Sequence, residues 1–208
     1  MGVFAALGTA LCWAIAARLF RGTGNAFSPL TMNFWKGLIS IAILAVVLVV
    51  VQPTGLSTHA ILWLLLSGLI GIGIGDTCFF KALQSIGDSQ AVLVAETLAP
   101  LFTALFAMAF IGEWITWQQW VGVAVVLFSV DMVIKVRKRS TTHVFATSGY
   151  LYGVGAALCQ AVGAVVSRDI LSAGEIDAAS AAFLRLVGGM VFVVPLIALT
   201  KTRYMPVI

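Results

Sequence analysis

Charge is scarce in this chain. Its 208 residues include 12 Lys or Arg and 8 Asp or Glu, which is 10% of the sequence, whereas a soluble domain carries about 25%. Residues 37–75 contain no charged side chain, and 61% of the chain belongs to the set AVILMFWYC. Disorder needs high charge and low hydrophobicity, so it is excluded along with an ordinary soluble domain. The composition instead predicts an all-α integral membrane protein.

Cysteines and basic clusters are equally sparse. The three cysteines, Cys12, Cys78 and Cys159, lie in separate apolar runs and form no CxxC pair, so no metal site is expected. The net charge of +4 comes from scattered residues rather than from a basic surface with aromatic side chains, which argues against a nucleic-acid partner. The hydrolase motifs HExxH and GxSxG are absent. We therefore expect no cofactor and no enzymatic activity.

Apolar runs of about 20 residues, long enough to cross a bilayer, occur seven times. Turn-forming residues separate them, such as Pro53 with Gly55 and Gly87 with Asp88. The seven predicted transmembrane helices cover residues 2–20, 31–51, 60–82, 89–111, 116–136, 148–167 and 178–199. The connecting segments are short, so no soluble domain is expected between the helices.

Basic residues gather on one side of this predicted bundle. We call this side the basic face; it holds the first, third and fifth connections and the last residues of the chain. Ten basic residues lie near it: Arg18, Arg21, Lys36, Lys81, Lys135, Arg137, Lys138, Arg139, Lys201 and Arg203. Only Arg168 and Arg185 lie near the opposite face. The positive-inside rule therefore predicts a cytoplasmic basic face, with the N-terminus outside.

The first predicted helix recurs as the sixth. A shift of 147 residues aligns residues 2–21 with 149–168, with identical residues that include Cys12 with Cys159 and Arg21 with Arg168. With a further shift of two residues, Lys36 corresponds to Arg185. Five helices precede the repeat, so the second copy enters the membrane inverted, which is a transporter architecture. We expect a first repeat at 1–139 and an incomplete second repeat of two helices at 148–208. A ten-helix protein is the expected whole, and a true seven-helix protein is the alternative.

Small residues recur four positions apart, on one side of a helix. Examples are Gly2, Ala6, Ala10 and Ala14 with their counterparts Gly149, Gly153, Ala157 and Ala161, and also Ser67, Gly71 and Gly75. Such stripes let two helix backbones approach closely, so we expect them to be packing faces.

Several short motifs follow one another in a fixed order. They are GDTCFFKAL at 75–83, IGD at 86–88, ETLAP at 96–100, IGE at 111–113 and WVGV at 120–123. In this order and spacing the chain resembles the EamA-type domain of the drug/metabolite transporter superfamily. The resemblance covers residues 2–136 as a whole repeat and 148–199 as part of a second.

This resemblance implies ten helices in two inverted repeats around a central cavity. It implies export or exchange of metabolites, amino acids or amphiphilic drugs without ATP, in a prokaryotic plasma (inner) membrane. It also implies cytoplasmic termini, whereas the charge count places the N-terminus outside. The expected partners are the lipid bilayer and a small-molecule substrate, and a homodimer is kept open.

Three charged residues inside the apolar helices are the main site candidates, because charges at membrane depth usually face a cavity or a partner. Lys36, Asp76 and Glu96 each lie about 9–10 Å from the basic face, counting 1.5 Å per residue. We expect Lys36 to pair with Asp76. Glu96 would then be a surplus carboxyl that carries a proton or meets a cationic substrate. A static ion network is the alternative.

Other candidates surround this layer. Pro100 cannot donate a hydrogen bond to the carbonyl of residue 96, and such a helix break at membrane depth is tolerated where it lines a cavity; a plain packing kink is the alternative. Asn33 is a candidate substrate contact. Trp13, Gln160 and Arg185 are candidate cavity residues, since polar or aromatic tips can orient a ligand.

Rival functions are a passive channel, a small-molecule-binding membrane protein and an intramembrane aspartyl protease. Gly73-Ile-Gly-Asp76 matches the GxGD pattern of such proteases. Their chemistry needs two close carboxyls that share a proton, but Asp131 lacks the expected preceding Tyr. The protease is therefore disfavoured.

Overall fold

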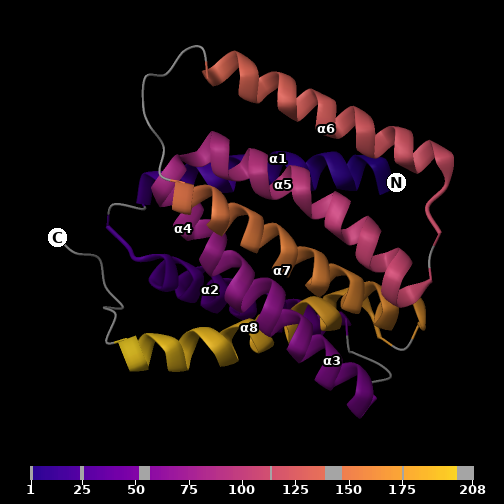
Figure 1. Cartoon of the computed structure of the whole chain (residues 1–208). Coiled ribbons are helices and arrows are strands. Elements are labelled where there is room, and N and C mark those ends of the chain that lie inside the picture. Colours follow the sequence, from indigo (N-terminus) through magenta and orange to yellow (C-terminus); the bar gives the residue numbers. More distant parts are fainter. Residues whose placement is uncertain are drawn as a thin grey trace.

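The computed structural model describes residues 2–23, 26–51, 57–112, 114–138, 147–174 and 176–200, and these residues form helices and no strand. The α-helices are α1 (Gly2–Thr23), α2 (Pro29–Val51), α3 (Thr58–Gly68), α4 (Asp76–Ile86), α5 (Asp88–Phe106), α6 (Trp117–Lys138), α7 (Thr147–Ser172) and α8 (Ala178–Thr200). Two π-helical segments, η1 (Leu69–Gly75) and η2 (Ala107–Ile111), join α3 to α4 and extend α5. The described residues thus form seven continuous helices that run along one bundle (Figure 1).

Five of these continuous helices are long and apolar enough to cross a membrane. They cover Pro29–Val50, Thr58–Ile86, Asp88–Ile111, Thr147–Ser172 and Ala178–Thr200. For α1 and α6, the structure describes side chains over only part of each helix, so membrane crossing by these two stays a prediction. The start of α1 and the end of α8 lie at opposite ends of the bundle (Figure 1), as an odd number of crossings requires.

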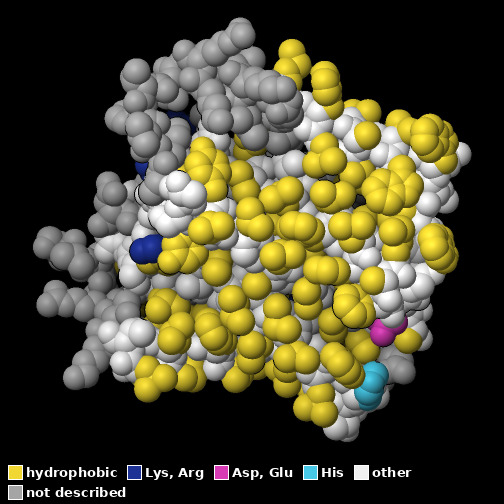
Figure 2. Space-filling model, in the orientation of Figure 1, with side chains coloured by type: hydrophobic (Ala, Val, Ile, Leu, Met, Phe, Trp, Pro, Cys, Tyr) yellow, Lys and Arg dark blue, Asp and Glu magenta, His cyan; other side chains and the backbone are white. Residues whose placement is uncertain are grey.

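Large apolar side chains cover the outside of the molecule. Phe4 of α1, Val49 of α2, Phe128 of α6 and Leu199 of α8 are each at least 70% exposed. Figure 2 shows one such face, where hydrophobic side chains predominate, Lys or Arg side chains lie toward one end, and acidic and histidine side chains lie at the other. Apolar patches of this extent are rare on soluble monomers. The chain is therefore an integral membrane protein whose outer surface faces lipid.

Short polar side chains and glycines set the helix ends. The Ser57 hydroxyl accepts from Ala60 N (3.1 Å) and starts α3. The Asp177 carboxylate starts α8 by accepting from the Ser180 hydroxyl (2.6 Å) and from the Ala179 and Ser180 backbone amides. These hydrogen bonds, that from the Ser180 hydroxyl first, lower the pKa of Asp177. Gly87 separates α4 from α5 with a φ of 84°, a conformation that L side chains rarely adopt.

Two buried clusters lie at opposite ends of the α3–η1–α4 helix. One surrounds Phe79, Phe80 and Leu83 of α4, and the other surrounds Leu64 of α3. Around this central helix, α7 packs against α3, α4 and α5, and α8 packs against α2 and α3. In contrast, α1 packs lightly, against α4 and α5, and α6 packs against α5. The space left beside α1 and α6 holds the candidate site.

The closest helix contact is the crossing of α3 and α8. A Cβ on Gly68 would overlap the backbone carbonyl of Arg185, and a Cβ on Gly188 would overlap that of Leu65. The two backbones therefore touch with no side chain between them. Gly188 lies outside the small-residue stripes predicted from the sequence.

We expect Gly188→Ala to destabilise the protein by about 1–3 kcal/mol or more, because the new methyl group cannot fit without moving a backbone. Thermal unfolding in detergent measures the change. Gly155→Ala on α7 is the matched control, because nothing lies within 4 Å of the new Cβ. Equal melting temperatures for Gly188→Ala and the wild type would contradict the described crossing.

Candidate functional site

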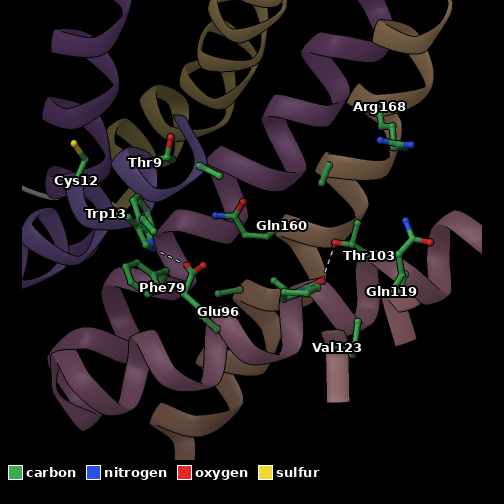
Figure 3. A pocket seen from close by; sticks show the side chains of 18 of the residues that line it. Thr9, Cys12, Trp13, Phe79, Glu96, Thr103, Gln119, Val123, Gln160 and Arg168 are labelled. Carbon is green, nitrogen blue, oxygen red and sulfur yellow. Dashed lines mark hydrogen bonds between the residues drawn. The ribbon is translucent and has the colours of Figure 1, made fainter. Parts of the chain in front are cut away.

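A large cavity opens beside α1, bounded by α1, α5, α6 and α7 with one residue of α4 (Figure 3). Its volume is about 1110 Å³, at the upper end of the range for small-molecule sites. The lining comprises Ala6, Thr9, Ala10, Cys12, Trp13, Ala16, Phe79, Ala95, Glu96, Ala99, Pro100, Thr103, Ala104, Ile115, Gln119, Val123, Ala156, Gln160, Ala164 and Arg168. Most of these side chains are small and apolar, so the few polar groups are the ones that can orient a ligand.

Glu96 is the acidic residue of this lining. One of its oxygens, Oε1, accepts a hydrogen bond from Trp13 Nε1 at 2.6 Å, and the Trp13 ring stacks on Phe79 with 5.5 Å between the ring centroids. Figure 3 shows the three side chains grouped at one end of the cavity. The ion pairs within the described residues do not include Glu96. The cavity therefore presents a carboxylate that has a neutral donor and adjacent aromatic rings but no cation partner.

Pro100 lies inside α5, one turn after Glu96, and it also lines the cavity. Its ring cannot donate to the Glu96 carbonyl. The Thr103 hydroxyl donates to the Ala99 carbonyl (2.7 Å) on the same wall. The backbone around the proline thus faces the cavity, while α5 continues as a helix to Phe106.

The predicted pairing of Lys36 with Asp76 is confirmed. Lys36 Nζ bonds Asp76 Oδ2, and it lies 5.9 Å from the centroid of the Phe80 ring. Asp76 Oδ1 accepts from Gln160 Nε2 at 3.2 Å. Asp76 is 3% exposed, and neither Lys36 nor Asp76 is part of the cavity lining. Gln160, which does line the cavity, therefore stands between the cavity and this buried ion pair.

Asn33 lies away from the cavity and supports the π-helix. It is 1% exposed, and its Nδ2 donates to the carbonyls of Ile72 (2.8 Å) and Gly73 (3.2 Å) and to the Thr77 hydroxyl (3.0 Å). These contacts fix η1 immediately before Asp76. The cavity lining does not include Asn33, because the bonded carbonyls hold its amide inside the bundle. Its role as a substrate contact stays a prediction.

Arg185 also lies outside the cavity lining. Its guanidinium Nη2 lies 3.3 Å from the Cβ positions of Gly71 and Gly163, in a slot that only glycines leave open. Its Nε is buried and has no hydrogen-bond partner in the described part of the chain. The charge of Asp76 acts on it. The expected cavity placement is thus corrected: close packing of α3, α7 and α8 directs the side chain between the helices.

The sequence repeat relates residues that play parallel parts here. Trp13 and Gln160 are counterparts under the 147-residue shift. Both line the cavity, and each donates to a carboxylate, Trp13 to Glu96 and Gln160 to Asp76. Lys36 and Arg185 are counterparts under the 149-residue shift, and Asp76 is the carboxylate that interacts with both. Residues at corresponding positions of the two predicted repeats therefore contact the two carboxylates, Asp76 on α4 and Glu96 on α5.

The small-residue stripes serve two purposes. On α7, Gly149 packs against Ile86 and Gly153 against Val94, as expected for a packing face. Ser67 on α3 donates to the Gly163 carbonyl (2.8 Å), which confirms the predicted contact of its stripe. In α1, however, Ala6 and Ala10 line the cavity. Among the described residues, this part of the stripe therefore borders the cavity and not a neighbouring helix.

Sequence reasoning missed Thr9, Phe79, Thr103, Gln119 and Arg168 of the lining. Arg168 carried a signal, because it is the repeat counterpart of Arg21, but Gln119 in WQQW looks like an interfacial residue. Glu113 of the IGE motif and the basic residues beyond Lys138 lie outside the described residues.

Comparison with known proteins gives two matches. The sequence model of the EamA-like transporter family matches residues 1–134. A protein named "Uncharacterized transporter in cobO 3'region" from a Sinorhizobium species is 27% identical over 124 residues, which cover 54% of this chain and 86% of that protein. The family match contains α1 to α5 and nearly all of α6, and therefore most of the cavity wall.

Proposed function

Because the chain belongs to the EamA-like transporter family, we propose that it is a secondary transporter, an exporter or exchanger, that moves a small organic molecule through the cavity beside α1. One observation carries this proposal. A carboxylate without a cation partner in the described residues, that of Glu96, faces a cavity of small-molecule size among membrane-spanning helices.

Such a carboxylate suits proton coupling. A charge without a counter-ion is costly at membrane depth, and either a proton or a cationic ligand neutralises it. The Trp13 N–H holds one oxygen in place, so the other can exchange its partner without rotation of the side chain. Glu96 is therefore the proposed coupling residue, and Lys36 with Asp76 is a fixed ion pair that shapes the wall behind it.

The proposed framework is a ten-helix inverted-repeat fold, in which α7 and α8 correspond to α1 and α2. The 147-residue repeat and the parallel contacts of Trp13 and Gln160 support this correspondence. All seven helices are then transmembrane. The bacterial relative supports a place in a prokaryotic plasma membrane, with a homodimer as one assembly to test.

For the topology, we expect the basic face to be cytoplasmic. In a chain whose three cysteines are replaced by Ala, Ser172→Cys at the opposite face should react with an impermeant thiol reagent on intact cells. Ser140→Cys, in a segment outside the described residues, should react only after the cells are broken. The reverse pattern would contradict the charge-based orientation.

Proton-coupled transport is tested with the purified full chain in vesicles that contain a trapped pH dye. Amino acids, aromatic ammonium compounds and aromatic carboxylates are added outside in turn. We expect at least one compound to move protons across the membrane at a rate that saturates with its concentration. Saturable exchange without any proton movement would contradict the proposed proton coupling. Flux that rises linearly with concentration would identify the passive channel that the sequence left open.

A further inference from the structure

We propose that the cavity selects organic monocations: molecules with one ammonium group, which lies beside Glu96, and a mainly apolar body. This inference rests on the proposed transport function and names its substrate class. It follows from the charge, the aromatic faces and the shape of the cavity, taken together.

The charge around Glu96 favours a cation. Asp76, the nearest other acid, is neutralised by Lys36. Arg168 is the one basic residue of the described lining. Lys36, Asp76 and Arg185 lie outside the lining, so the inner end of the cavity wall carries one negative charge, that of Glu96, which one ammonium group would balance. An anion at the same place would meet that charge at close range, and such a contact between like charges costs several kcal/mol.

The position of Arg168 argues against a zwitterion held by both charged groups. The Cβ position of Gly153 on α7 lies 3.0 Å from Val94 on α5, which fixes the relative height of these two helices. Both helices run away from the basic face, and Arg168 lies fifteen residues beyond Gly153, about 22 Å, whereas Glu96 lies only about 3 Å beyond Val94. The separation of about 19 Å exceeds the reach of an α-amino acid, whose two charges are attached to one carbon. Its carboxylate would lie beside Glu96 instead.

The walls suit the rest of such a molecule. Trp13 and Phe79 stack next to Glu96 (Figure 3), and aromatic faces attract ammonium groups, including quaternary ones that have no hydrogen to donate. Beyond them, alanines of α1, α5 and α7 leave the cavity wide and apolar. The polar groups on these walls, Thr9, Thr103, Gln119 and Gln160, carry no charge. A bulky apolar body therefore gains contact without leaving a buried charge unpaired.

This arrangement makes the proton and the ligand competitors for one carboxylate. A bound cation displaces the proton from Glu96, and a proton displaces the cation. The exchange balances in charge, because one positive charge replaces another at the same site. Proton movement against the cation is therefore a direct consequence of the geometry.

The test uses three probes that share a phenethyl body and differ in charge: phenethyltrimethylammonium, L-phenylalanine and 3-phenylpropionate. Binding to the purified full chain is measured by calorimetry, and exchange is measured in vesicles. We expect the ammonium probe to bind, to exchange and to release protons, and the other two to do neither. Glu96→Gln should weaken its binding by about 30-fold or more, and Glu96→Asp should retain part of it.

Asp88→Asn is the matched control, because Asp88 is a carboxylate in a surface ion pair with Arg18 (3.8 Å); it should leave binding unchanged. Thermal unfolding of each variant shows that it is folded. Exchange of L-phenylalanine or 3-phenylpropionate in place of the ammonium probe would overturn the substrate class and leave the transport function standing. Unchanged ammonium binding in a folded Glu96→Gln variant would also overturn it, even if that variant had lost proton-driven flux.

Discussion

Glu96→Gln is expected to abolish proton-driven transport while the protein still folds and inserts. The substitution keeps the size of the side chain and an oxygen that accepts from Trp13 Nε1, but it removes the group that exchanges a proton. Without that group, a pH gradient has no site through which to act on the substrate. Flux driven by a pH gradient should fall to the level of protein-free vesicles, measured with the compound that the wild-type chain transports best.

Two variants make this result specific. Thr103→Val changes another polar residue of the cavity wall without touching a titratable group and should retain most of the gradient-driven flux. Glu96→Asp should retain a weaker, still pH-dependent flux. If Glu96→Gln kept full gradient-driven flux, coupling would belong to another group, and the carboxylate would have a structural role only.

Asp76→Asn should produce the largest loss of stability, about 3–5 kcal/mol, because it leaves the charge of Lys36 buried without a counter-ion. The same substitution removes the carboxylate whose charge acts on Arg185. Two basic side chains would thus lose their acidic partner at once. Thermal or denaturant unfolding in detergent measures the loss.

Asp88→Asn is the matched control, because it removes a carboxylate from an ion pair at the surface and not from a buried one. That variant removes the surface ion pair with Arg18, whose contribution should be at most about 1 kcal/mol. The double substitution Lys36→Met with Asp76→Leu should recover part of the stability lost by Asp76→Asn, because it removes the unpaired charge of Lys36 and leaves only Arg185 without its acidic partner. Equal melting temperatures for Asp76→Asn and Asp88→Asn would show that the Lys36–Asp76 pair is not a stabilising contact.

The sequence predicted those features that depend on depth along a helix. Hydrophobic runs separated by turn residues gave the helices of the bundle, and counting residues from the basic face brought Lys36 together with Asp76. The position of Glu96 next to Pro100 likewise indicated a residue in a cavity wall. Height along an axis follows from 1.5 Å per residue, so these expectations needed no knowledge of the packing.

Features that depend on direction around a helix were beyond the sequence. Asn33 and Arg185 lie at suitable depths, but tertiary packing turns both side chains away from the cavity. The stripe of small residues on α1 has the same spacing as that on α7, yet it borders the cavity. The π-helical turn of η1 rotates the residues after it relative to an α-helix, and the sequence held no signal for it beyond its glycines.

The crossing of Gly68 and Gly188 has a consequence for how this bundle can move. Where α3 and α8 cross at Gly68 and Gly188, no side chain lies between the two backbones, so no change of rotamer can absorb a sliding movement there. Sliding would bring a side chain one turn away onto the opposing backbone, so the crossing resists translation. Rotation about the point of contact keeps the two backbones together there and moves the side chains packed beside it, such as Leu64 of α3 and Ala181 of α8. We therefore expect relative movement of α3 and α8 to be a change in their crossing angle, with the contact at Gly68 and Gly188 as its fixed point.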